Sequence, residues 1–167
     1  MTSESARRAL QAEVRSAFAG VVRPAEDLIA LHQCPECDAL RAAFAHESWD
    51  AMSDDLIERN ELALPLLSPD AFAYFLPAYL LYSLDHLSCT AGVTEMTVYA
   101  VSPSAGANAN LENWAQERIA PFTDQQARVI DRFLELAERD EELSSYMSDI
   151  AERRVRFKEL RAKCSAP

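Results

Sequence analysis

Apolar residues are concentrated in one continuous stretch near the middle of the chain. From Ala71 to Tyr82 every residue is apolar or aromatic, apart from the tyrosine hydroxyls. A helix without a polar face has no side to turn toward water, so this stretch predicts a helix at the centre of the fold. Ser68, Pro69 and Asp70 precede it and are typical of a helix start, because serine accepts from first-turn N–H groups and proline loses no hydrogen bond there. The run is shorter than the roughly 20 residues that span a bilayer.

Pro77 falls in the middle of this apolar stretch. Its ring clashes with the preceding turn, which predicts either a kink or two short helices of which the second opens at Pro77. The hydroxyls of Tyr74, Tyr79 and Tyr82 need hydrogen-bond partners if they are buried. We interpret these tyrosines as polar anchors of a core rather than as the lining of a ligand pocket, because aromatic residues at helical spacing usually pack inward.

Shorter helices are predicted on both sides of the central one. Apolar residues recur every four positions from Ala6 to Phe18, which indicates a helix over 5–18. Cys34 before Pro35 predicts a capped helix start that turns Cys37 inward. Further helices are predicted over residues 24–31, 53–60, 111–120 and 123–139, the last with a T-x-x-Q capping box.

Two stretches allow more than one interpretation. The β-branched residues of 93–101 favour a strand, but their spacing fits a helix face, and a lone strand has nothing to pair with, so we expect a helix. Residues 102–110 predict a loop. Residues 140–163 predict one last helix whose inward stripe is interrupted by Arg154, so that this helix either detaches partway or docks against acidic residues. The stripe consists of Leu143, Met147, Ile150, Phe157 and Leu160.

These elements predict an all-α fold, a single-domain bundle of short helices around a proline-kinked, buried central helix. A length of 167 residues suits one domain, and 49% hydrophobic with 26% charged residues is a globular composition. Only 3 glycines occur, which argues against glycine-rich phosphate loops. The first residues lack the apolar core of a signal peptide, and with no membrane span predicted we expect a cytoplasmic protein.

Charge is distributed unevenly along the chain. The formal net charge is −11, yet residues 153–167 hold six bases and one acid. The sequence thus divides into an acidic helical part, 1–152, and a basic end, 153–167, of the same domain. An acidic body repels nucleic-acid phosphates and attracts basic partners. Such a charge also aids solubility, which is the alternative explanation.

Acidic residues gather around the predicted helix at 53–60. This patch consists of Glu47, Asp50, Asp54, Asp55, Glu58 and Glu61. A calcium loop of the D-x-D-x-D-G type is missing. The patch therefore favours a basic protein partner, because complementary charge speeds encounter between proteins.

His32, Cys34, Cys37 and His46 form the clearest cluster of chemically active side chains. A C-x-x-C pair with imidazoles suits zinc, although His46 follows Cys37 by nine residues and joins the set only if the intervening helix ends before it. The C-P-E-C sequence at a helix start also resembles locally the C-P-x-C of glutaredoxin-like proteins, which indicates a redox-active thiol pair. A third interpretation is a helix cap with a core-facing cysteine.

No catalytic motif is recognisable. Asp85 and His86 adjoin, but neither G-x-S-x-G nor H-E-x-x-H accompanies them, so a helix C-terminus explains the histidine better. We therefore expect a protein without enzymatic activity.

Three segments together carry a resemblance to a known family. They are H-Q-C-P-E-C-D-A-L-R-A-A-F with the following Trp49, L-L-S-P-D-A-F-A-Y-F-L-P-A-Y-L-L, and F-T-D-Q-Q-A-R-V-I-D-R-F-L. The combination resembles a bacterial family catalogued only as a domain of unknown function, over roughly residues 15–137, and the basic end after Asp149 lies outside it. The resemblance implies a mostly helical, bacterial, cytoplasmic protein and no established activity.

The sequence predicts two alternative functions. The first is an acidic interaction protein that binds a basic protein partner and needs no cofactor, nucleic acid or membrane. A toxin-neutralising immunity protein is one instance, by analogy of class. The alternative is a small zinc-binding or thiol-redox protein centred on Cys34 and Cys37.

Overall fold

The chain wraps its other helices around one apolar helix, α4 (Pro69–Asp85). The structure is a computed structural model and describes residues 3–87, 92–102 and 109–164. Twelve of the 17 residues of α4 are buried, as the absence of a polar face predicts. The Ser68 hydroxyl accepts from the backbone N–H of Ala71 at 3.2 Å, so the predicted helix start is confirmed.

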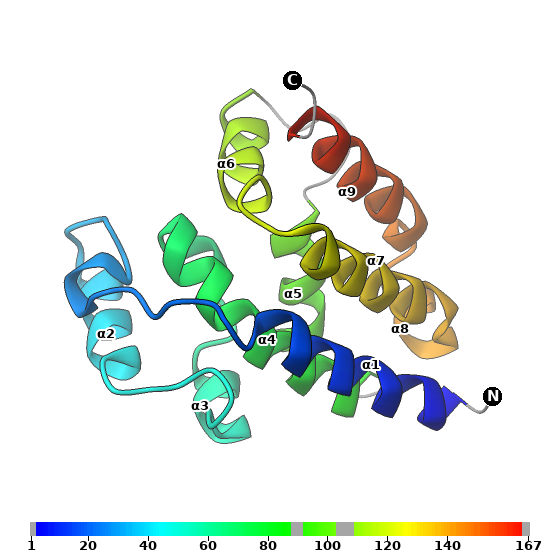
Figure 1. Cartoon of the computed structure of the whole chain (residues 1–167), viewed down its shortest axis with the longest axis horizontal. Coiled ribbons are helices and arrows are strands. Elements are labelled where there is room, and N and C mark those ends of the chain that lie inside the picture. Colours follow the sequence, from blue (N-terminus) through cyan, green and yellow to red (C-terminus); the bar gives the residue numbers. More distant parts are fainter. Residues whose placement is uncertain (1–2, 88–91, 103–108, 165–167) are drawn as a thin grey trace.

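The described residues form nine α-helices with two short 3-10 turns and no strand, which confirms the all-α fold (Figure 1). Before α4 come α1 (Ser3–Phe18), η1 (Glu26–Leu28), α2 (Pro35–Phe44), α3 (Asp54–Arg59) and η2 (Leu64–Leu66). After it come α5 (Val93–Val101), α6 (Ala109–Ile119), α7 (Asp124–Arg139), α8 (Glu141–Tyr146) and α9 (Ile150–Cys164).

The helices pack in two groups on either side of α4. On one side α7 packs between α1 and α9, and α9 also contacts α6. Figure 1 shows α2 and α3 at the opposite end of the molecule from α9. The strongly amphipathic α7 begins at a capping box in which Thr123 and Gln126 exchange hydrogen bonds of 2.9 and 3.2 Å. That start is confirmed as the sequence predicts.

Each tyrosine hydroxyl of α4 contacts a residue that precedes the helix in sequence. The buried Tyr79 hydroxyl donates to the Asn60 carbonyl at 2.7 Å, and the Tyr82 hydroxyl donates to Glu58 at 2.7 Å. The Tyr74 hydroxyl lies 3.4 Å from that of Ser48. Burial raises the pKa of Tyr79. These contacts fasten α3 and its flanks to the central helix, which confirms the tyrosines as polar anchors.

The structure corrects or limits four predictions about helix boundaries. The helix predicted over residues 24–31 is wrong, because only the 3-10 turn Glu26–Leu28 forms there. The helix α4 runs unbroken through Pro77, so a division into two helices is wrong, and a kink there stays a prediction. Residues 93–101 are helical as expected. The single helix predicted over 140–163 is wrong, because residues 147–149 separate α8 from α9. Most of the loop predicted at 102–110 lies outside the described residues.

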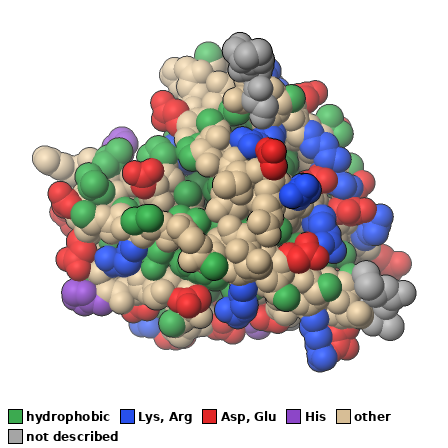
Figure 2. Space-filling view, viewed as in Figure 1, with side chains coloured by type: hydrophobic (Ala, Val, Ile, Leu, Met, Phe, Trp, Pro, Cys, Tyr) green, Lys and Arg blue, Asp and Glu red, His purple; other side chains and the backbone are tan. Residues whose placement is uncertain are grey.

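The basic end of the chain docks against acidic residues of the same molecule. Arg154 lies 2.8 Å from Asp131, 3.5 Å from Glu135 and 3.3 Å from Glu138, all on α7. Of the two alternatives predicted for this helix, docking is therefore the one observed. Figure 2 shows basic and acidic side chains interleaved on this side.

The other basic residues of α9 are paired in the same way. Arg156 and Lys163 both contact Glu112 of α6, at 2.8 and 2.6 Å. Arg161 lies 3.0 Å from Asp124. The predicted boundary between the acidic part and the basic end, at residue 152, thus lies inside α9. Carboxylates of α6 and α7 pair with the basic residues beyond it. No helix in the described part of the chain is long and apolar enough to cross a membrane.

The Asp131 carboxylate predicts an acid-dependent loss of stability. Burial alone would raise its pKa, but Arg154 and Lys158 together lower it below the ordinary value of 3.8. A carboxyl with a lower pKa in the folded state stabilises that state above its unfolded pKa, and this stabilisation disappears as the pH falls through the folded value.

We therefore expect Asp131→Asn to lower the free energy of unfolding at neutral pH by about 1 kcal/mol. Between about pH 5 and about pH 3 the variant should lose less stability than the wild type, because it lacks the shifted carboxyl. Urea denaturation across this pH range measures both effects. Glu142→Gln, at an exposed position of α8, is the control, and equal pH profiles for wild type and Asp131→Asn would contradict the assignment.

Candidate functional site

The predicted acidic patch lies on α3 and its flanks, and two of its members bind α4. Asp54 lies 3.2 Å from His86 Nε2, and Glu58 accepts the Tyr82 hydroxyl at 2.7 Å. The repulsion expected between Asp54 and Glu58 is therefore reduced by separate partners. These two carboxylates have a structural role in addition to any role in binding.

The remaining patch residues are less constrained. Asp55 pairs with Arg59 of the same helix at 2.6 Å, and Asp50 accepts from Ser48 at 2.5 Å. The Glu61 carboxylate lies against Gly92, where a Cβ would clash with it. Glu47 is half-buried, and the other five predicted patch residues are exposed. The structure thus brings the predicted residues to one region and leaves most of their carboxylates accessible.

The charge excess of the protein lies largely in residues 21–87, which we call the acidic segment. It contains twelve acidic residues and three arginines. Eleven of the twelve carboxylates are exposed, Glu47 being the exception. Because α9 is balanced by α6 and α7, the acidic segment is the part of the molecule with uncompensated charge.

The three arginines of the acidic segment are engaged inside it. Arg23 donates to the carbonyls of Phe44, Ala45 and Glu47 and so caps the C-terminal end of α2. Arg41 donates to the carbonyls of Ala30 and His32 and pairs with Asp38, and Arg59 pairs with Asp55. Where these arginines pair with an acidic residue, that residue lies three or four positions away on the same helix.

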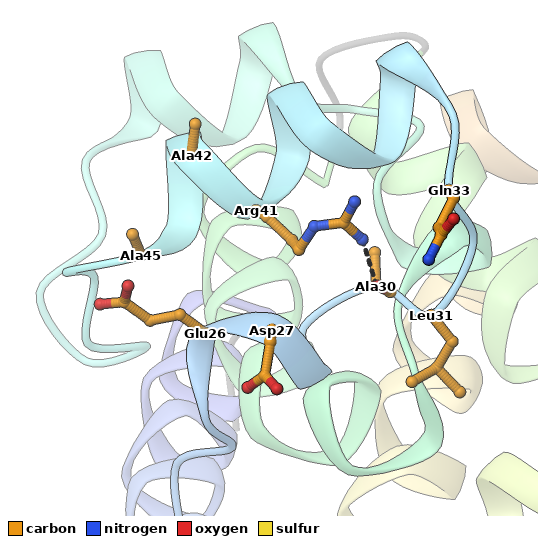
Figure 3. Close-up of a pocket in the computed structure, with 8 residues that line it drawn as sticks. All are labelled: Glu26, Asp27, Ala30, Leu31, Gln33, Arg41, Ala42 and Ala45. Atoms are coloured by element: carbon orange, nitrogen blue, oxygen red, sulfur yellow. Dashed lines mark hydrogen bonds between the residues drawn. The ribbon is translucent and has the colours of Figure 1, made fainter.

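A hollow of about 520 Å³ lies between η1 and α2 in the acidic segment (Figure 3). Arg41 reaches across it from α2 to the Ala30 carbonyl. Glu26 and Asp27 contribute carboxylates from η1, and both residues are exposed. Glu26 also lies 3.4 Å from His46 Nδ1. The hollow therefore presents acidic groups beside an apolar rim formed by Leu31.

Cys34 and Cys37 stand at the start of α2 as the sequence predicts. The Cys34 sulfur caps the helix by accepting from the Cys37 N–H at 3.4 Å, and Cys37 is 1% exposed. A hydrogen bond to Cys34, followed by burial, raises the pKa of the Cys37 thiol. Cys34 remains partly accessible at the edge of a second hollow of about 390 Å³, which His32 also lines.

His46 does not join these cysteines. It follows the C-terminal end of α2, and a helix of ten residues is about 15 Å long. The described residues include no group of three or more His, Cys, Asp or Glu side chains placed to hold one metal ion. The structure therefore does not bring the four predicted ligands together in one group.

Asp85 and His86 also have separate partners. Asp85 accepts from the Gln11 side chain at 2.6 Å, whereas His86 faces Asp54. Two features of this part of the molecule are not among the predicted site residues. Glu26 and Asp27 are consecutive acids in a predicted helix start, a signal that was available. The buried Arg118 of α6 donates a hydrogen bond to the Leu67 carbonyl, 51 residues away in sequence. No local sequence pattern predicts such a contact.

The fold and the surface define a small all-helical protein with one strongly acidic segment and a cysteine pair at a helix start. Residues 6–158 match the model of a family of unknown function (DUF6714), and the chain belongs to this family. The match extends beyond the resemblance estimated from motifs, and it includes the first half of α9. A search of curated proteins and a search of solved structures each found no match.

The cysteine geometry predicts unequal thiol reactivity. Cys34 is partly accessible, whereas Cys37 is buried and has a raised pKa, so Cys34 should react with a disulfide reagent at least about tenfold faster. Measuring thiol release near pH 8 in Cys34→Ser and Cys37→Ser variants, both lacking Cys89 and Cys164, separates the two rates. Faster reaction of Cys37 in the folded protein would contradict this placement.

Proposed function

We propose that this protein is a non-enzymatic binding protein whose acidic segment holds a basic protein partner. The observation that carries the proposal is the charge asymmetry: α9 is paired along its length with the molecule's own carboxylates, whereas the acidic segment keeps eleven exposed carboxylates against three engaged arginines. Complementary charge of this kind accelerates association and favours partners of opposite sign.

A toxin-neutralising immunity protein is one instance of the proposed class. Such an inhibitor needs a preformed acidic surface and no chemistry of its own, which agrees with the features described. We infer a cytoplasmic location for this role, because four cysteines in 167 residues are too few for the disulfide framework of a small secreted domain.

The second candidate function centres on the cysteine pair. Both cysteines lie at the start of α2, where the Cys34 sulfur accepts from the Cys37 backbone N–H at 3.4 Å. This placement favours thiol–disulfide chemistry over zinc, because a disulfide needs only the two cysteines and a zinc site needs further ligands. Elemental analysis of the purified protein tests the zinc version. About one equivalent of metal, with melting that falls on chelation, would support it.

Charge reversal tests the leading proposal. Asp27, Asp50 and Asp55 are exposed and do not bind α4, so their triple substitution by lysine should preserve the fold. We expect the triple variant to lose co-purification with the basic partner that the wild type retains from its native cell, as read by mass spectrometry.

The matched control carries the same change of charge elsewhere. Lysines at the exposed positions of Glu141, Glu142 and Glu152 should leave co-purification intact. Circular dichroism checks that both triple variants are folded. Equal loss of co-purification in the two variants would show that net charge alone determines binding. No loss of co-purification in either variant would exclude the acidic segment as the binding surface.

A further inference from the structure

The acidic segment also carries most of the exposed apolar side chains. Eight large hydrophobic residues are exposed in the described chain, and five of them lie in this segment: Val22, Leu28, Leu31, Leu62 and Leu66. Figure 2 shows hydrophobic side chains at the surface on the side where Figure 1 places α2. Apolar groups beside a charged rim are typical of protein interaction sites.

Leu31 and Leu66 flank the second hollow, of about 390 Å³, which opens between the starts of α2 and α4 and the face of α6. Leu31 is 60% exposed and Leu66 is 37% exposed. Trp114 of α6 adds an aromatic wall, and the buried Leu67 also lines the hollow. A space of this size and lining suits one large apolar side chain from another molecule.

Polar groups of this hollow are arranged by depth. Glu36 and Glu117 are exposed residues at its edge. Arg118 is buried, stacks over Trp114 at 4.2 Å and donates to the Leu67 carbonyl at 2.6 Å. Desolvation lowers the pKa of Arg118 to about 10. Because the arginine is fixed inside and the carboxylates lie outside, an approaching chain meets negative charge first.

The two hollows adjoin, since Leu31 lines both of them. A chain that crosses Leu31 therefore meets Glu26 and Asp27 on one side and the apolar hollow on the other. These two adjoining surfaces therefore favour a partner segment that contains both a cationic and an apolar side chain.

We propose that the hollow between α2, α4 and α6 binds a large apolar side chain of the basic partner, while a lysine or arginine of the same segment contacts Glu26 and Asp27. This inference rests on the proposed function and specifies the partner's chemistry. A purely basic chain would leave the hollow empty, and a purely apolar chain would leave the carboxylates without contacts.

Selection of displayed random 12-residue peptides on the full chain tests the proposal without a known partner. We expect the enriched peptides to share a basic residue and a large apolar residue at fixed spacing. Fluorescence anisotropy with one enriched peptide then measures the variants. Leu31→Ser and Leu66→Ser should each weaken binding at least about tenfold. Val155→Ser, at a 58% exposed position on α9, should change it less than about twofold.

The outcomes separate this inference from the proposed function. Weakening by Asp27→Lys with no effect of either leucine substitution would overturn the apolar hollow and preserve the acidic surface. Weakening by the leucine substitutions alone would overturn the acidic surface. Failure to enrich peptides of the expected composition would overturn the inference, as would a dimer that Leu31→Ser converts to a monomer, because a second copy would then occupy the hollow.

Discussion

The burial of α4 on all sides is the constraint on which the rest of the structure depends. An apolar helix of 17 residues cannot face water, so the neighbouring segments must cover it, and the chain supplies short helices before and after it. The three tyrosine hydroxyls of this helix bind residues that precede α4 in sequence, and the buried Ser83 hydroxyl donates to Thr97 of α5. The same bonds that stabilise the core therefore also position α3 and its carboxylates.

Around the enclosed α4, the acidic segment and the C-terminal part of the chain pair their charged side chains differently. Arg154 and its neighbours on α9 meet carboxylates of α6 and α7, and the resulting network raises the pKa of Arg154. The acidic segment has no comparable set of bases. Arg23 caps α2, and Arg41 and Arg59 make contacts within the segment. The negative charge of the segment therefore remains available to another molecule. The exposed leucines lie in this same segment, which is why charge and apolar contact are combined in the binding surface that we propose.

Local signals predicted the fold well where a side chain acts on its own first turn. Ser53, Ser68 and Thr123 cap the helices that follow them, and Cys34 does the same through sulfur. The break after α8 shows where a periodic pattern misleads, because Leu143, Met147 and Ile150 point inward whether or not one helix joins them. The D-x-x-E sequence from Asp149 to Glu152 is the local signal for the helix start at Ile150. The second hollow could not be predicted, because Arg118 of α6 and Leu67, which follows η2, meet only in the folded chain.

Hydrogen–deuterium exchange of the intact protein tests the burial of α4 most directly. Buried helices at the centre of a cooperative fold exchange only through global unfolding, whereas peripheral ones open locally. We expect the amides of α4 to exchange most slowly, with an opening free energy equal to that of global unfolding, while α2 and α3 exchange faster. Exchange in α4 as fast as in α3 would contradict the central position of α4, because this helix would then open without disrupting the fold.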